Sequence, residues 1–164
     1  MKGMVVYYSK TGSTKIVAER LAEKLGFAVE GLEDSKPRPS AGPVLSGILN
    51  LTVALRDPLP DIKNVGLIVL VTPIWAWHPT PQISTFVKRS GISGKKVFLV
   101  GVGAGATNDK AMRRFARRVS KKGGEVIGTK SLKGLQLKQA LEEIEADLIK
   151  TADDLADSIR DTAR

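Results

Sequence analysis

The chain has 164 residues and no cysteine, and its 26 Lys and Arg against 17 Asp and Glu give a net charge of +9. This length allows roughly two-thirds of the unfolded chain's surface to be buried, so no disulfide or metal is needed for stability. The missing thiols exclude a cysteine nucleophile, a Cys-ligated iron–sulfur or zinc centre and a CxxC redox pair, so any redox chemistry requires a bound cofactor.

All apolar runs are too short for a signal peptide or a membrane span. The sequence contains no internal repeat, and no change of composition marks a domain boundary. We therefore expect one cytoplasmic domain over residues 1–164, without membrane contact.

Runs of Val, Ile, Leu and aromatic residues predict five β-strands, at Met4–Tyr8, Phe27–Leu32, Gly66–Val71, Val97–Val100 and Glu125–Thr129. The first, third and fourth runs are unbroken, as a sheet buried on both faces requires. The second and fifth runs are weaker, so we expect them near the edges of the sheet.

Stretches between the strands have apolar residues at helical spacing, which predicts amphipathic helices. These apolar positions are Val17, Leu21 and Leu25; Met112, Phe115, Ala116 and Val119; and Leu141, Ile144, Leu148, Leu155 and Ile159. Gly26 and Gly123 follow the first two stretches, where helix C-caps are expected. The proline-rich connection from Glu33 to Asn64 leaves room for one helix, which we place at Leu45–Arg56.

Strands that alternate with helices predict right-handed βαβ crossovers and a parallel sheet covered on both faces. The expected class is therefore a doubly wound α/β fold. Ligands of such folds bind outside the carboxyl ends of the strands, so the residues directly after each strand are the most informative.

The segment after the first strand is rich in hydroxyl groups and reads Ser9, Lys10, Thr11, Gly12, Ser13 and Thr14. At the start of a helix it offers backbone N–H donors, O–H donors and the positive end of the helix dipole, which together suit a phosphate. The alternative is a plain strand-to-helix turn with Ser or Thr as the N-cap. The spacing of a Walker A loop is absent.

The segment after the third strand contains both tryptophans of the chain and reads Thr72, Pro73, Ile74, Trp75, Ala76 and Trp77, followed by His78. Indole rings stack well on a flat conjugated ring. The alternative is that the tryptophans fold back into the core. His78 is the only histidine and has no second histidine or carboxylate cluster nearby, so we assign no metal ligand there. We expect an ordinary loop residue, and the alternative is a proton donor to a cofactor.

The segment after the fourth strand has glycine at every second position and reads Gly101, Val102, Gly103, Ala104, Gly105 and Ala106. Such a backbone can approach a ligand closely. The string also fits the GxGxx[GA] dinucleotide fingerprint, but that motif belongs in the first βα unit with an acidic residue about 20 positions on. Glu125 begins the next predicted strand instead of ending it, so a nicotinamide site is the less favoured interpretation of this segment.

Over essentially its whole length the chain resembles the flavodoxin family. In that family a Ser/Thr-x-Thr-Gly-x-Thr loop holds the phosphate of flavin mononucleotide (FMN), and Ser9, Thr11, Gly12 and Thr14 occupy those places here. The family's Thr/Ser-Pro-x-Trp/Tyr loop flanks the flavin, and residues 72–75 match it. Only Ser131–Leu137 separates the fifth strand from the last helix, so the chain looks like a short-chain member.

The resemblance implies a five-stranded sheet of order 2-1-3-4-5 and an FMN site. The expected cofactor contacts are Ser9, Lys10, Thr11, Gly12, Ser13, Thr14, Thr72, Pro73, Ile74, Trp75, Ala76, Trp77, Val102, Gly103, Ala104 and Gly105. The expected activity is electron transfer as a carrier. An NAD(P)H-dependent flavin or quinone reductase, or a binding module that has lost its flavin, stay as alternatives.

Most flavodoxins are acidic, whereas this chain is basic, so we expect an acidic redox partner such as a ferredoxin or a reductase. Much of the excess charge forms a helical stripe of Arg113, Arg114, Arg117, Arg118, Lys121 and Lys122. This stripe is either a solvated face or a docking surface. No aromatic residues are interleaved with it, so we expect no nucleic-acid binding. A monomer and a homodimer both fit the sequence.

Overall fold

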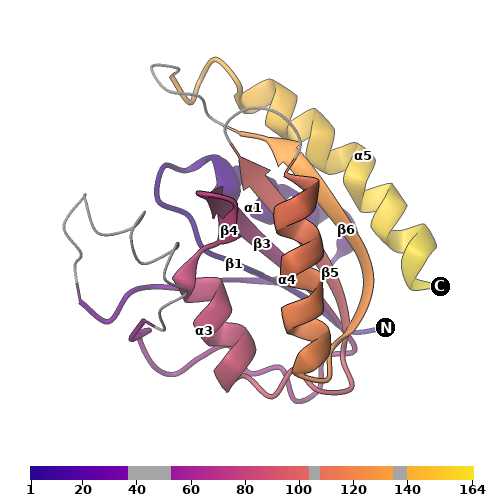
Figure 1. Ribbon diagram of the computed structural model, residues 1–164. Coiled ribbons are helices and arrows are strands. Elements are labelled where there is room, and N and C mark those ends of the chain that lie inside the picture. Colours follow the sequence, from indigo (N-terminus) through magenta and orange to yellow (C-terminus); the bar gives the residue numbers. More distant parts are fainter. Residues whose placement is uncertain (37–52, 104–107, 135–139) are drawn as a thin grey trace.

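The computed structural model describes residues 1–36, 53–103, 108–134 and 140–164 (Figure 1). Its parallel strands are β1 (Gly3–Tyr7), β2 (Ala28–Gly31), β3 (Leu67–Trp75), β5 (Lys96–Gly103) and β6 (Glu125–Lys133). They lie in the order β2-β1-β3-β5-β6. The fold class and strand order predicted from the sequence are confirmed, and the two weaker strands are at the edges.

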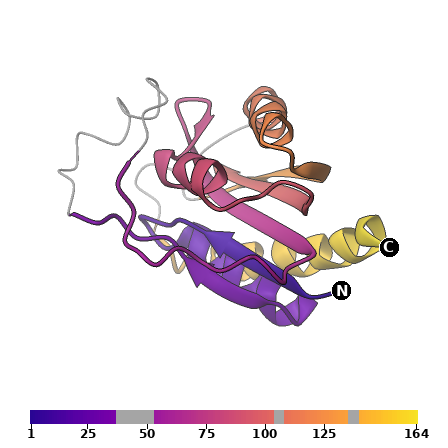
Figure 2. The ribbon, with the colours of Figure 1, turned by 90° about the horizontal axis from the view of Figure 1, so that it is seen from below.

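The sheet lies between two layers of helices (Figure 2). On one face, α1 (Ser13–Leu25) and α5 (Glu145–Ala163) cover Val5, Val69 and Phe98, among others. On the other face, α3 (Pro81–Arg89) and α4 (Asp109–Lys121) pack on side chains that alternate with these along the same strands. Because both faces are buried, the central strands need the continuous apolar sequence they have.

The helices form where the apolar spacing predicts them. Helix α1 ends at Gly26, whose left-handed φ of 69° is one that glycine adopts without steric cost. Helix α5 begins at Glu145, so Leu141 and Ile144 lie before it and not in it. A bidentate pair joins the two helices of this layer: Arg20 Nε and Nη2 donate to the carboxylate of Asp153 at 2.6 and 2.8 Å.

Helix α3 is absent from the sequence prediction. Thr80 is its N-cap and Pro81 opens it, which is a favoured place for proline. Residues 81–87 are all buried, including the polar residues Gln82, Ser84 and Thr85. Prolines at positions 79 and 81 made this segment read as part of a loop.

The helix predicted at Leu45–Arg56 is wrong at residues 53–56, and its earlier residues lie outside the described ranges. Leu55 forms an isolated antiparallel bridge with Asp34. The N–H of Val53 donates to Oγ1 of Thr85 at 3.0 Å, and the N–H of Arg56 donates to the carbonyl of Glu33 at 2.9 Å. Extended pairing with residues 33–35 therefore replaces helical hydrogen bonds here.

Three predicted strands end too early. Strand β3 continues from Val71 to Trp75, β5 from Val100 to Gly103, and β6 from Thr129 to Lys133. Polar residues and glycines at these ends hid the extensions. Among the helices of the described ranges, none is long and apolar enough to cross a membrane.

Gly128 of β6 tests the packing on the α1/α5 face. A Cβ there would lie 2.4 Å from Cε2 of the buried Phe98 ring. We expect Gly128→Ala to lower the free energy of unfolding by about 1–3 kcal/mol, because the ring must move within a packed core. Urea denaturation measures the effect. Lys130→Ala, at an exposed site on the same strand, is the control and should change stability by less than about 0.5 kcal/mol.

Candidate functional site

The register of the central strands brings the predicted segments to one edge of the sheet. Tyr7, the last residue of β1, pairs with Val71, and the N–H of Tyr8 donates to the Val71 carbonyl at 3.3 Å. On the other side of β3, Thr72 and Pro73 pair with Gly101 and Val102. The hydroxyl-rich segment, the tryptophan segment and the glycine segment therefore all leave the carboxyl edge of neighbouring strands.

The hydroxyl-rich segment forms the entrance to α1. Gly12 is the N-cap with a φ of 98°, and no side chain caps the helix. The first hydrogen bond of the helix runs from the N–H of Ile16 to the Gly12 carbonyl, so the N–H groups of residues 13–15 precede it. Ser9 Oγ accepts the N–H of Gly12 at 3.2 Å, which shapes the turn, and its own hydroxyl hydrogen can still donate.

Side chains of this segment differ in exposure. Lys10 and Thr11 are exposed, Ser9 and Gly12 are half-buried, and Ser13 and Thr14 are buried. A Cβ on Gly12 would lie 2.8 Å from the side chain of Leu141, so the glycine also allows close packing of the chain before α5. The first turn of α1 contains no acidic residue.

The tryptophan segment is a β-hairpin and not the loop that the sequence predicted. Strand β3 pairs antiparallel with the short β4 (His78–Pro79), with Ile74 opposite Pro79 and Trp75 opposite His78. Ala76 and Trp77 make the turn with φ angles of 45° and 62°. Two positive φ angles are typical of a type I′ hairpin turn, whose usual residues are Asn and Gly. The sequence lacks those residues, which is why the hairpin was missed.

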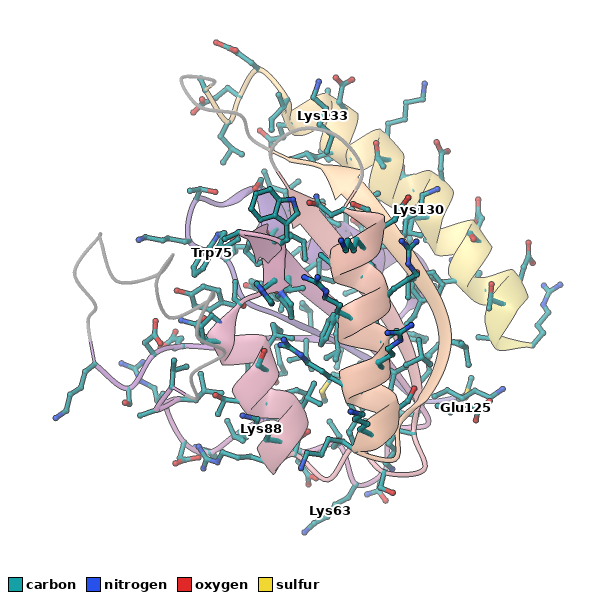
Figure 3. All side chains as sticks on the ribbon, viewed as in Figure 1. Lys63, Trp75, Lys88, Glu125, Lys130 and Lys133 are labelled. Atoms are coloured by element: carbon teal, nitrogen blue, oxygen red, sulfur yellow. The ribbon has the colours of Figure 1, made fainter. Side chains whose placement is uncertain are left out.

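The two tryptophans have different environments. Trp77, at the turn, is 70% exposed. Trp75 is half-buried, and its ring meets that of Tyr8 edge to face with centroids 6.0 Å apart (Figure 3). The alternative that both tryptophans fold into the core is therefore wrong for Trp77.

Thr72 and Pro73 are strand residues. Thr72 is fully buried, and its Oγ1 accepts the N–H of Thr80 at 3.1 Å and lies 3.2 Å from the Thr80 hydroxyl. These bonds fix the base of the hairpin. Pro73 lies beyond Val71, where β1 no longer pairs with β3, so the missing N–H interrupts no ladder with β1.

Close packing inside the protein explains why two positions of the glycine segment have no side chain. A Cβ on Gly101 would lie 2.5 Å from Met112 Sδ, and one on Gly103 would lie 2.2 Å from Asn108 Nδ2. The side chain of Val102 belongs to the core on the α1/α5 face. Ala104 and Gly105 lie outside the described residues, so the prediction of cofactor contacts there stays a prediction.

Sequence reasoning missed a polar cluster beneath the hairpin. Gln82 Nε2 donates to both carboxylate oxygens of Asp34 at 3.0 Å, and the Tyr8 hydroxyl donates to Asp34 at 3.3 Å. Gln82 is 2% exposed. The cluster thus fixes the hydroxyl of Tyr8, whose ring contacts Trp75. Its members are far apart in the sequence and belong to no motif, so no signal could have found it.

His78 connects the hairpin to α4. Its Nδ1 accepts a hydrogen bond from Arg118 Nη2 at 3.4 Å. Burial, followed by the positive charges of Arg118 and Arg114, lowers the pKa of His78 below its usual range. The lowered pKa favours the neutral imidazole, whose Nδ1 accepts the hydrogen bond from the arginine of α4.

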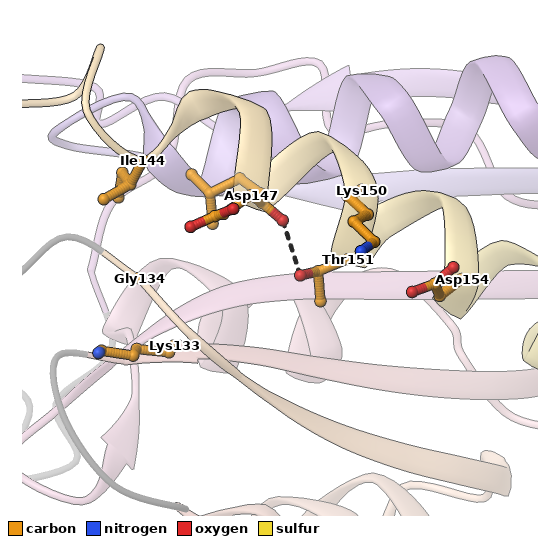
Figure 4. Close-up of a pocket in the computed structure, with 8 residues that line it drawn as sticks. Lys133, Gly134, Ile144, Asp147, Lys150, Thr151 and Asp154 are labelled. Atoms are coloured by element: carbon orange, nitrogen blue, oxygen red, sulfur yellow. Dashed lines mark hydrogen bonds between the residues drawn. The ribbon is translucent and has the colours of Figure 1, made fainter.

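A hollow of about 480 Å³ lies beside this edge, between the end of β6 and α5 (Figure 4). Its charged lining is mixed, with Lys133 and Lys150 against Asp147 and Asp154. The Thr151 hydroxyl within it donates to the Asp147 carbonyl at 2.7 Å. The described residues that line this hollow carry opposite charges and include no aromatic side chain, so it suits a phosphate and a conjugated ring less well than the edge of β1 and β3 does.

No family model matches the sequence, and no curated protein matches it either. Solved structures do match. A flavoprotein from Lactobacillus acidophilus in complex with FMN is 24% identical, with a TM-score of 0.69 over 79% of this chain and 92% of its own. Oxidised flavodoxin 2 from Bacillus cereus is 17% identical, with a TM-score of 0.60 over 98% of this chain and 99% of its own.

The fold is flavodoxin-like. The NAD(P)H:quinone oxidoreductase of Methanothermobacter marburgensis shares it, with 14% identity and a TM-score of 0.62 over 98% of this chain and 97% of that one. At these identities the comparisons establish the flavodoxin-like fold alone. The resemblance seen in the sequence is thereby confirmed for the architecture.

The turn of the hairpin can be tested through Trp77. A left-handed conformation costs an ordinary residue about 1–2 kcal/mol, whereas asparagine tolerates it. We expect Trp77→Asn to leave the free energy of unfolding unchanged or to raise it by up to about 1 kcal/mol. Trp75→Asn, which removes packing against Tyr8, should lower it by at least about 1 kcal/mol. Urea denaturation compares the two variants. A clear loss of unfolding free energy in Trp77→Asn would contradict the solvent-exposed position of the Trp77 indole.

The pairing of His78 with α4 can be tested by NMR titration, since the chain has 1 histidine and its ring signals are unambiguous. The pKa of His78 should lie below its usual range and rise in Arg118→Gln, because a repelling charge has been removed. Arg164→Gln, an exposed change at the far end of α5, is the control. An equal rise in both variants would mean that overall charge, not the Arg118 contact, lowers the pKa.

Proposed function

We propose that this protein binds FMN at the carboxyl edge of β1 and β3 and transfers electrons through it. The observation that carries the proposal is the placement of an uncapped helix N-terminus and a displayed indole at the ends of two adjacent strands. One feature suits a phosphate, and the other suits a conjugated ring.

The phosphate would be held at the start of α1. The N–H groups of residues 13–15 precede the first hydrogen bond of the helix, and no side chain caps them. Backbone donors and the helix dipole both favour an anion there. The hydroxyls of Ser9, Thr11 and Thr14 add donors, and the absence of acidic residues from the first turn removes a source of repulsion.

The ring would be covered by the hairpin. Trp77 is held out of the core by a turn that is unfavourable for its residue type, and strained backbone of this kind is commonest at ligand sites. Trp75 is steadied by Tyr8, so its indole needs little ordering on binding. When bound, FMN supplies one- and two-electron redox chemistry that no side chain of this chain could provide.

The Lactobacillus acidophilus flavoprotein of the same fold is described in complex with FMN, which supports the choice of this flavin. The quinone oxidoreductase among the solved structures supports a second candidate, an NAD(P)H-dependent reductase on the same site. Steady-state oxidation of NADPH and NADH, with and without a quinone, separates the two. Turnover favours the reductase, and its absence in a protein that holds FMN favours the carrier.

The proposed site is tested by titrating the protein with FMN and following flavin absorbance and tryptophan fluorescence. We expect Thr11→Val with Thr14→Val to weaken FMN binding roughly a hundredfold or more, because hydrogen bonds to a charged group contribute about 1.5–3 kcal/mol each. The matched control is Thr129→Val with Thr162→Val, which removes two exposed hydroxyls from β6 and α5.

Loss of FMN affinity in the first variant alone supports the site. Equal affinity in both variants would place the ligand elsewhere. A protein that stays colourless and shows no spectral change at millimolar FMN would end the proposal.

A further inference from the structure

Three arginines of helix α4 lack a carboxylate partner within the part of the chain that the structure describes. Elsewhere in the described ranges the arginines form ion pairs with Asp or Glu: Arg20, Arg56, Arg89, Arg160 and Arg164. On α4, by contrast, Arg113, Arg114 and Arg117 have no such partner among the described residues. Their field extends into solvent instead of being cancelled on the protein surface.

A groove of about 170 Å³ runs between α3 and α4. Val87 and Phe115 contribute apolar side chains to it, together with Ser84. Lys88 of α3, Lys121 of α4 and Lys122, the C-cap of α4, form its rim, and Arg118 also lines it. Figure 3 shows Lys88 on α3, on the side of the sheet that α4 covers. The groove thus combines an apolar floor with a cationic border from both helices.

We propose that the α3/α4 groove is the docking site for an acidic protein segment that carries an apolar anchor side chain. The anchor would lie on the floor between Val87 and Phe115. The carboxylates would lie against Lys88, Lys121 and Lys122, with the outer arginines of α4 steering the approach.

The floor and the surrounding surface favour this occupant over other polyanions. A nucleic acid would contact the lysines but has no side chain to fill an apolar floor. A membrane needs exposed apolar side chains, and in the described ranges the large exposed ones are Met1, Val29 and Trp77, none of which lines the groove. An acidic segment with an apolar anchor satisfies both parts of the groove.

The groove is linked to the hairpin through one side chain. Arg118 lines the groove and donates to His78, which pairs with Trp75 across the hairpin. A docked segment would therefore be separated from the proposed flavin cover by two residues. Only the role of this docking in electron transfer rests on the proposed function. Binding of the acidic segment does not require FMN.

The test uses a synthetic peptide of about 20 residues, long enough to form a helix, with Leu and Phe at helical spacing among glutamates and a red fluorophore at one end. Fluorescence anisotropy measures its binding to the full chain, with and without FMN. Polyglutamate of equal length, a single-stranded oligonucleotide and vesicles of anionic lipid are the competing probes. We expect the peptide to bind more tightly than polyglutamate and to be displaced poorly by the other two.

Two variants locate the binding. Lys88→Glu with Lys121→Glu reverses one rim charge on each helix and should weaken peptide binding about tenfold or more. Lys130→Glu with Lys150→Glu makes the same change in net charge at exposed sites on β6 and α5 and should weaken it less than threefold, a drop of ~0.6 kcal/mol. Ser84→Leu fills the groove without changing charge and should also weaken binding, with circular dichroism to verify the fold.

A resident peptide should also raise the pKa of His78, because its carboxylates offset the charge of Arg118. Equal losses in the two lysine variants would overturn the proposal, since net charge alone would then explain the binding. Equal affinity for polyglutamate, or preference for the oligonucleotide or the vesicles, would overturn it as well. Because each result is read without FMN, it stands apart from the outcome of the flavin titration.

Discussion

The pairing of β1 with β3 determines where the proposed site can form. The pairing of the two strands ends at Tyr7 opposite Val71. Beyond this pair, the segment after β1 leads into α1, whereas β3 continues to the hairpin. A shift of one residue would turn every side chain of β1 to the opposite face of the sheet. Val5 and Val6 are buried on opposite faces, so each helix layer opposes such a shift. The edge that carries the polar segments is fixed by the core.

The hairpin departs from the preferences of its own sequence. Alanine and tryptophan occupy a turn for which Asn and Gly are suited, and the indole at the tip is mostly exposed. The surroundings hold the hairpin in place, since Thr72 and Thr80 bond at its base and His78 is bound to α4. Conflict between local preference and the global fold is commonest where function imposes it. The same tip is where a conjugated ring would stack.

The sequence predicted those features that depend on one local physical effect. It did not predict features that require contacts between residues far apart in the chain. Apolar runs predicted the five parallel strands, the resemblance to flavodoxins predicted their order, and apolar spacing predicted α1, α4 and α5. Helix α3 was missed because the prolines at positions 79 and 81 made its start look like a loop. The cluster of Tyr8, Asp34 and Gln82 depends on a long connection that no local pattern describes. The hydroxyl-rich entrance to α1 was located correctly because a strand, a glycine and a helix follow one another directly there.

Helices α1 and α4 treat charge differently, and the difference has an energetic cost. On the α1/α5 face, Asp153 is shared by Arg20 and Lys24. On α4, Arg113 and Arg117 are four residues apart and of like charge, an arrangement that destabilises a helix by about 0.2–0.5 kcal/mol per pair. Burial of Met112, Phe115 and Val119 easily offsets that cost, so the helix forms despite its surface. A glutamate at any of the exposed positions would have relieved the repulsion. Folding alone does not account for an arrangement that lowers the stability of α4, and the proposed docking of an acidic segment beside this helix would account for it.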